Sequence, residues 1–178
     1  LRFSPDGTKL VTLMPQGLLE LWDVGTGENR GGVQLSEKPD WEPTVALSPD
    51  GGTVAICRGM EQFYFDTRSG RKLFSHKTHR QPIVASIFSP DGRIHATLSE
   101  DYRIVLRSMP SGERLRTFSR SKYAPRGMAF SHDSRLLATC GHDNLIKIWD
   151  VATGELVTEI RGHKRPVNLL AFTPDGRT

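Results

Sequence analysis

Histidine and aspartate are the residues of this sequence that could do chemistry, because their side chains bind metals and transfer protons. The sequence holds six histidines, and His76 and His79 have a spacing that a pair of metal ligands could use. No cluster of cysteines or carboxylates accompanies this pair, whereas a zinc site needs three or four ligands. We therefore expect structural histidines, no metal site and no catalytic residues.

Aspartates and glycines recur at fixed intervals along the chain. A hydroxyl residue followed by glycine could suggest a phosphate-binding loop. This pair recurs at the same position of each repeat, as Thr26-Gly27, Ser69-Gly70, Ser111-Gly112 and Thr153-Gly154. These pairs lack the Lys-Ser/Thr and the helix that a phosphate-binding loop requires. The recurring aspartates are Asp6, Asp50, Asp91 and Asp175. A feature that returns in every repeat is a turn, so we expect turn formers and no cofactor.

The chain contains five copies of one turn motif. The copies are Phe3-Ser4-Pro5-Asp6-Gly7, Leu47-Ser48-Pro49-Asp50-Gly51, Phe88-Ser89-Pro90-Asp91-Gly92, Phe130-Ser131-His132-Asp133-Ser134 and Phe172-Thr173-Pro174-Asp175-Gly176. They start 41 to 44 residues apart. A period of this length is typical of stacked four-stranded sheets.

Two further markers keep a fixed phase to this motif. Trp22-Asp23, Phe65-Asp66, Arg107-Ser108 and Trp149-Asp150 begin 18 or 19 residues after its first residue, and His79 and His163 precede it by nine. On these residues the whole chain resembles the WD40-repeat family. The resemblance implies an all-β fold of four-stranded antiparallel propeller blades.

One period shows why strands are expected. In the fourth repeat, residues 145–149 alternate between polar and apolar side chains, as a strand with one buried face does. The blades are expected at about 1–36, 37–76, 77–119 and 120–161, and residues 162–178 begin a fifth blade with an innermost strand at Val167–Phe172. We expect an open arc, a bacterial-type piece of a longer propeller, whose exposed end blades allow self-association.

Composition suits a turn-rich β protein of 178 residues, with 17 glycines, 11 prolines and a net charge of +4. No apolar run approaches the roughly 18 residues of a membrane span. Cys57 and Cys140 occupy matching positions in the second and fourth blades, which are not neighbours, so we expect free thiols. Free thiols favour a reducing, cytoplasmic setting.

The resemblance also implies a hydrogen-bonded tetrad of His, Ser/Thr, Asp and Trp in each blade. When the tetrad is placed on this sequence by position within the repeat, its residues are Thr12, Trp22, His79, Thr97, Asp101, Thr139, Asp143, Trp149 and His163. No blade is complete: Arg107 replaces Trp in blade three, Ser121 replaces His in blade four, and Gln16 replaces Asp in blade one. Blade two has Ile56, Met60 and Phe65 at these positions, so we expect no tetrad there.

The same resemblance implies a partner-binding face where the loops before the innermost strands meet the turns between the second and third strands. Its expected residues are Trp41, Arg58, Pro82, Glu100, Tyr123, Arg126, His142 and Asn168. Trp41 is the expected anchor, because tryptophan dominates interface energetics. The basic loops favour acidic or phosphorylated protein partners.

The expected function is a non-catalytic scaffold for protein–protein interaction. One alternative is the sensor portion of a larger signalling enzyme, such as a WD40-fused Ser/Thr kinase, and a second is the propeller gate of a serine hydrolase. Nucleic acid is disfavoured, because Tyr123 is the sole candidate for the aromatic residues that a single-strand binder places between its basic residues.

Overall fold

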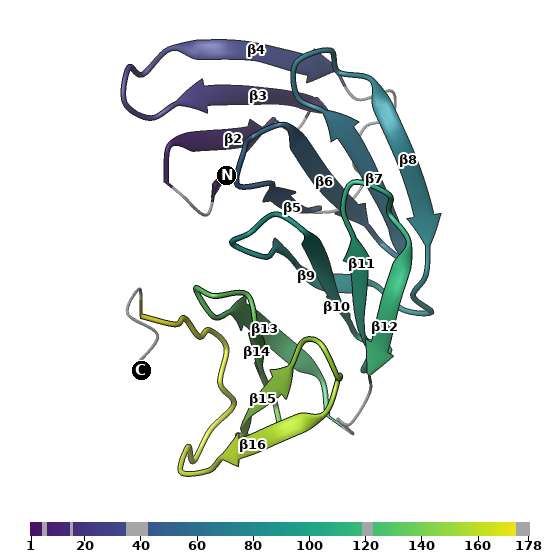
Figure 1. Ribbon diagram of the computed structural model, residues 1–178, viewed down its shortest axis with the longest axis vertical. Coiled ribbons are helices and arrows are strands. Elements are labelled where there is room, and N and C mark those ends of the chain that lie inside the picture. Colours follow the sequence, from purple (N-terminus) through teal and green to yellow (C-terminus); the bar gives the residue numbers. More distant parts are fainter. Residues whose placement is uncertain (5–6, 15, 35–42, 119–122, 174–178) are drawn as a thin grey trace.

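The computed structural model describes residues 1–4, 7–14, 16–34, 43–118 and 123–173. Its described strands form four antiparallel sheets of four strands each, and no described residue lies in a helix. The sheets fan out as an open arc (Figure 1). The all-β propeller-blade architecture expected from the repeat is confirmed.

Each sheet is one blade, and its strands follow one another in chain order. Blade one comprises β1 (Arg2–Phe3), β2 (Lys9–Leu13), β3 (Leu18–Asp23) and β4 (Asn29–Gln34). Blade two comprises β5 (Thr44–Leu47), β6 (Thr53–Arg58), β7 (Glu61–Asp66) and β8 (Lys72–Lys77). Blade three comprises β9 (Ile83–Phe88), β10 (Ile94–Ser99), β11 (Ile104–Ser108) and β12 (Arg114–Phe118). Blade four comprises β13 (Pro125–Phe130), β14 (Leu136–Gly141), β15 (Ile146–Asp150) and β16 (Leu156–Ile160).

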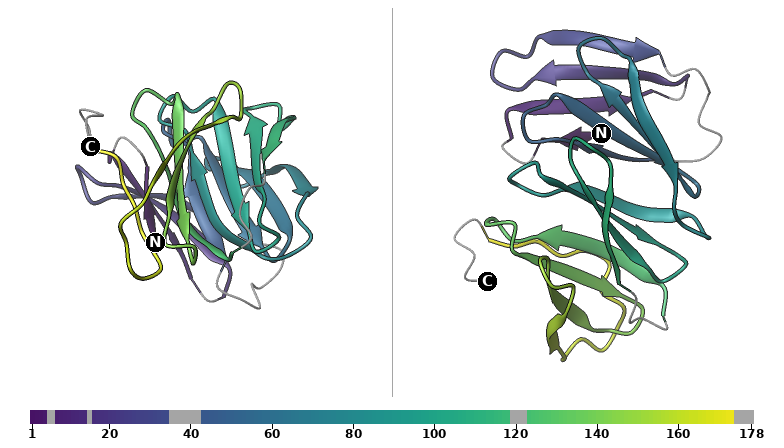
Figure 2. Two further views of the ribbon diagram at one scale, coloured as in Figure 1. Left: turned by 90° about the horizontal axis from the view of Figure 1, so that it is seen from below. Right: turned by 45° about the vertical axis from the view of Figure 1, so that its right-hand side comes forward.

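The innermost strands of successive blades lie next to one another: β1 contacts β5, β5 contacts β9, and β9 contacts β13. The outermost strands β4, β8, β12 and β16 lie on the far side of each sheet (Figures 1 and 2). Neighbouring blades therefore pack face to face around an inner edge, as propeller blades do.

The recurrent turn motif joins the first two strands of each blade. In blade two the Ser48 hydroxyl donates to Asp50 and accepts from the Thr53 amide, at 2.5 and 2.8 Å. The turn requires a positive φ three residues after the serine: Gly51 has +68°, and Ser134, which replaces glycine in blade four, has +62°. The recurring aspartates at the described positions 50 and 91 are therefore turn residues, and Asp6 and Asp175 lie outside the described residues.

The expected extra innermost strand, Val167–Phe172, is not formed: residues 161–173 have no strand assignment. This segment instead runs alongside blade four, where the Val167 amide donates to the Gly141 carbonyl at 3.2 Å. A strand exists only with a partner that completes its hydrogen bonds, and no described strand follows Ile160 to supply one.

The apolar core is divided among the blade interfaces. One cluster joins blades one and two around Val11, Leu19 and Val54, and another joins blades three and four around Leu106, Phe118 and Trp149. The apolar cluster between blades two and three is smaller, with four buried members: Ala46, Ala55, Tyr64 and Phe88. Polar side chains fill the remainder of that interface, and they form part of the site described below.

Candidate protein-binding rim and its supporting networks

Antiparallel pairing brings the loop before each innermost strand to the same end of a blade as the turn between its second and third strands. In blade three the Glu100 amide donates to the Pro82 carbonyl at 2.9 Å, and in blade four the His142 amide donates to the Ala124 carbonyl at 3.0 Å. We call this end the loop rim, and its described candidate residues are Arg58, Pro82, Glu100, Tyr123, Arg126, His142 and Asn168.

The loop rim also connects successive blades. The Ile83 amide of blade three donates to the Gly59 carbonyl of blade two at 2.8 Å. The Val167 amide makes the equivalent bond to Gly141 of blade four. The entry loop of one blade is thereby fixed to the turn of the blade before it.

Within blade four the structure brings two of the candidate residues together. Arg126 Nε donates to His142 Nε2 at 2.9 Å, and both residues are exposed. This hydrogen bond orients the guanidinium of Arg126 and the ring of His142 toward each other. Tyr123, which is 57% exposed, precedes the same strand.

The other candidates are dispersed along the arc. Pro82 and Glu100 are exposed in blade three, Arg58 is half-buried at the end of β6, and Asn168 is exposed beside blade four. Trp41, the expected aromatic anchor, lies outside the described residues.

Beneath the loop rim, blade three contains a hydrogen-bonded network at its tetrad positions. His79 Nε2 lies 2.9 Å from Thr97 Oγ1, and His79 Nδ1 lies 3.1 Å from Asp101 Oδ2. Asp101 also accepts from the backbone amides of Arg80 and Arg103, at 2.9 and 3.0 Å. This aspartate therefore fixes the entry loop and the following turn to the same sheet.

The charge state of this network follows from burial. Burial lowers the pKa of His79, and this effect outweighs the opposing one of the Asp101 carboxylate, so the ring is neutral at neutral pH. Burial by itself would raise the pKa of Asp101, but the amide of Arg80 and the His79 ring stabilise its carboxylate and hold the pKa below its usual value.

A second polar set extends this network into blade two. His95 is completely buried and lies 2.8 Å from both the Tyr64 hydroxyl and the Ser86 hydroxyl. Gln62 donates to Thr97 at 3.2 Å and accepts from Tyr64 at 3.1 Å. These hydrogen bonds join blades two and three, in place of the larger apolar clusters found at the other interfaces.

Arg107, which replaces the tetrad tryptophan, is buried in the same interface. Its Nη1 donates to the Gly112 carbonyl at 2.6 Å, and its Nε has no partner among the described residues. Burial lowers its pKa, and Arg114 lowers it further. A buried cation with one hydrogen bond is costly, and it also disfavours protonation of His95.

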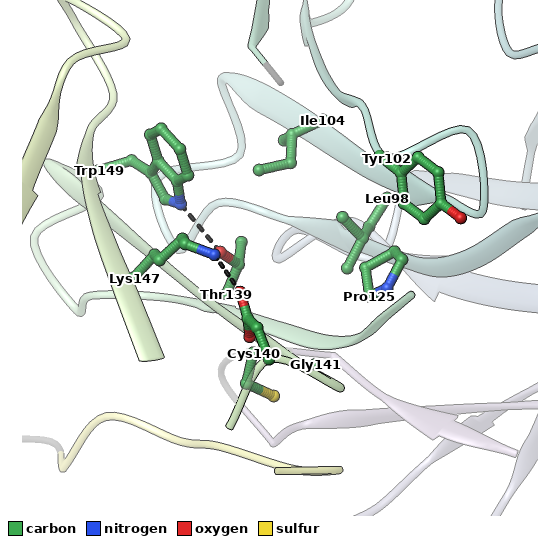
Figure 3. Close-up of a pocket in the computed structure, with 10 residues that line it drawn as sticks. Leu98, Tyr102, Ile104, Pro125, Thr139, Cys140, Gly141, Lys147 and Trp149 are labelled. Atoms are coloured by element: carbon green, nitrogen blue, oxygen red, sulfur yellow. Dashed lines mark hydrogen bonds and ion pairs between the residues drawn. The ribbon is translucent and has the colours of Figure 1, made fainter. Parts of the chain in front are cut away.

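Blade four has other side chains, and other contacts between them, at the same positions (Figure 3). Trp149 Nε1 donates to Thr139 Oγ1 at 2.8 Å, and Lys147 forms a buried ion pair with Asp143. The Lys147 side chain is 8% exposed and that of Asp143 is 9% exposed. A cavity of about 20 Å³ lies beside the pair, between Leu98 of blade three and Trp149.

Sequence reasoning missed Lys147 and His95, although a signal was present. Each lies two residues from a tetrad position on its strand, His95 from Thr97 and Lys147 from Trp149. Residues two apart in a strand share a face, so both face the neighbouring blade.

The tetrad positions of blades one and two hold a Trp–Thr hydrogen bond and apolar side chains, respectively. Trp22 Nε1 donates to Thr12 Oγ1 at 3.1 Å on the face of blade one that is turned away from blade two. Ile56 and Phe65 of blade two pack in the apolar cluster with blade one. His163, an expected tetrad residue, is exposed and makes no hydrogen bond within the described chain.

Metal-ligand clusters and reactive thiols are the other features that could carry chemistry. Within the described ranges, no three His, Cys, Asp or Glu side chains gather as a metal site would require. Cys57 and Cys140 are buried free thiols, and burial raises the pKa of Cys57 to about 11. Among the residues that the structure describes, none lies in a helix that could span a lipid bilayer.

Comparison with known proteins agrees with this geometry. Residues 112–150 match the family model "WD domain, G-beta repeat". The chain is 31% identical over 119 residues to "WD repeat-containing protein SL1-17" from Schistosoma mansoni. This alignment covers 62% of the chain and 36% of the relative, so the chain spans about a third of that protein. The repeated turns, the four-stranded blades and these matches together support a relationship of the chain to the WD40-repeat family.

Proposed function

We propose that this chain is a non-catalytic scaffold that binds partner proteins through the loop rim. WD40 repeats generally mediate protein–protein interaction. The observation that carries the proposal is the exposed group of Tyr123, Arg126 and His142, in which Arg126 and His142 are held together by a hydrogen bond. Tyrosine and arginine are enriched among the residues that dominate the binding energy of protein interfaces.

The charge of the loop rim favours an acidic partner. Arg58 and Arg126 are cationic and Glu100 is anionic, so the rim residues carry one net positive charge, and the chain has a net charge of +4. Complementary charge speeds association and makes it sensitive to salt. We therefore propose a partner that offers an acidic segment to the loop rim.

Site-specific crosslinking tests this proposal with a control from the same blade. A benzoylphenylalanine is placed at Tyr123 on the loop rim and, separately, at His132, which is exposed in the turn at the opposite end of blade four. In cells that express the full-length protein, we expect Tyr123 to crosslink to a defined partner and His132 not to do so.

A charge change then tests the mechanism on the captured partner. Arg126→Glu is expected to slow association with that partner, and the effect should shrink at high salt. Crosslinks that form from His132 alone, or association that does not respond to Arg126→Glu, would place the binding surface elsewhere.

A further inference from the structure

In three blades, one cation on or next to the outermost strand has a partner within that blade. Arg30 on β4 lies 3.4 Å from the carboxylates of Asp23 and Glu28. Arg161, directly after β16, lies 2.9 Å from Glu159. On β8, Lys72 lies over the Phe63 ring, 4.9 Å from its centroid.

Blade three differs, because its outer strands carry arginines without carboxylate partners. Within the described ranges, Arg103, Arg114 and Arg116 form no ion pair. Asp101, the acid nearest in sequence to Arg103, already accepts from His79 and from two backbone amides. The buried Arg107 lies directly opposite Arg114 in the β-ladder and adds a fourth cation.

Arg103, Arg114 and Arg116 line an open groove of about 460 Å³ on the outer edge of blade three. Thr78, directly after β8, and Thr117 on β12 line the same groove. Figure 1 shows the end of β8 beside β12 on the convex side of the arc. We call this site the arginine groove.

We propose that the arginine groove binds a phosphorylated segment of a protein partner, which lies extended along β12. A phosphate carries nearly two negative charges and three acceptor oxygens, and guanidinium groups bind it bidentately. The outward edge of β12 pairs with no described strand, so its backbone groups are open to an added strand.

Protein is favoured over nucleic acid as the bearer of the phosphate. No aromatic residue is among those that line the groove in the described chain. Binding of single strands depends on aromatic side chains that stack on the bases. The groove residues are also distinct from those of the loop rim, so the two proposals can fail separately.

The test measures fluorescence anisotropy of the full chain with three labelled probes. These are a library of phosphoserine and phosphothreonine peptides, its unphosphorylated counterpart, and a short single-stranded thymidine oligonucleotide. We expect some phosphopeptides to bind well above their unphosphorylated counterparts. Arg116→Ser should weaken their binding about tenfold, and the Arg114→Ser/Arg116→Ser double variant should weaken it further.

Arg30→Ser is the matched control, because Arg30 is also exposed on an outermost strand but is already ion-paired. It should leave phosphopeptide binding unchanged. The proposal is overturned if phosphorylation adds nothing across the library, if the oligonucleotide binds as tightly, or if Arg30→Ser weakens binding equally. It is also overturned if the groove variants aggregate while binding is unchanged, since the arginines would then only protect an open sheet edge.

Discussion

Blade three packs on blade two mainly through polar side chains, whereas blade four packs on blade three through an apolar cluster. Position by position, His95 and Arg107 of blade three correspond to Leu137 and Trp149 of blade four. The repeat therefore preserves the backbone register while the chemistry of the interface changes. A blade interface in this arc needs complementary partners rather than one fixed set of residues.

The two interfaces also differ in how they carry charge beneath the loop rim. In blade three, Asp101 meets a histidine that burial keeps neutral. In blade four, Asp143 meets Lys147 in a buried ion pair. A neutral network loses hydrogen bonds when it is cut, whereas a broken ion pair leaves an uncompensated buried charge.

The largest expected effect therefore belongs to Asp143. Asp143→Ala leaves the buried Lys147 ammonium without a counter-charge and should lower the free energy of unfolding by about 3–5 kcal/mol. Chemical denaturation of the purified chain measures this loss. Adding Lys147→Met to Asp143→Ala should recover most of the stability; a double variant that is no more stable than Asp143→Ala would show that the buried charge is not the cause.

Asp101→Ala should cost less, about 2–3 kcal/mol, because it leaves neutral donors rather than a charge without partners. The affected donors are the His79 ring and the amides of Arg80 and Arg103. The same denaturation experiment ranks the two aspartates. If Asp101→Ala proved more damaging than Asp143→Ala, the contrast between a neutral and an ionic network would be wrong.

His95→Leu gives blade three the leucine that blade four has at the corresponding position, Leu137, and should change how the free energy of unfolding depends on pH. Burial and the Arg107 cation lower the pKa of His95 to about 3, against about 6.5 in an unfolded chain. Between these values the unfolded chain binds more protons, so the free energy of unfolding falls as the pH falls. The variant should lose about 1–2 kcal/mol at pH 7, because Tyr64 and Ser86 each lose a hydrogen-bond partner.

The informative readout for His95→Leu is the slope of stability between pH 6.5 and 4, which should be shallower than in the parent chain. Some slope should remain, because burial also lowers the pKa values of His76 and His79 in the same interface. Asp101, whose pKa is lowered in the folded chain, adds to the slope at the lower end of this range, whereas Tyr64, Cys57 and Arg107 should not titrate in it. An unchanged slope would mean that His95 is not among the groups that titrate on unfolding.

The smallest effects come from the two Trp–Thr hydrogen bonds. Thr139→Val should cost about 1 kcal/mol, because Trp149 is buried, and Thr12→Val about half of that, because Trp22 is only half-buried. Thermal unfolding of both variants gives the comparison. Equal losses would indicate that the end face of blade one is covered in solution.

Much of the architecture could be predicted from the sequence, because repeated turns impose repeated geometry. The period of 41 to 44 residues, the turn serines and aspartates and the two-residue alternation of residues 145–149 depend on short-range backbone requirements. The phase of the repeat also placed His79, Thr97 and Asp101 at matching positions of one blade, and hydrogen bonds join them. The sequence by itself therefore determined the blades and their order.

Only the tertiary structure decided which side chains meet between blades. Tyr64 and His95 lie 31 residues apart in the sequence, and their hydrogen bond depends on how blade two packs on blade three. The ion pair of Lys147 with Asp143 likewise requires a buried face, and the missing strand at Val167–Phe172 reflects the lack of a described pairing partner. Local spacing sets the turns and the register, but the partner of a buried polar group is chosen by the surface that covers it.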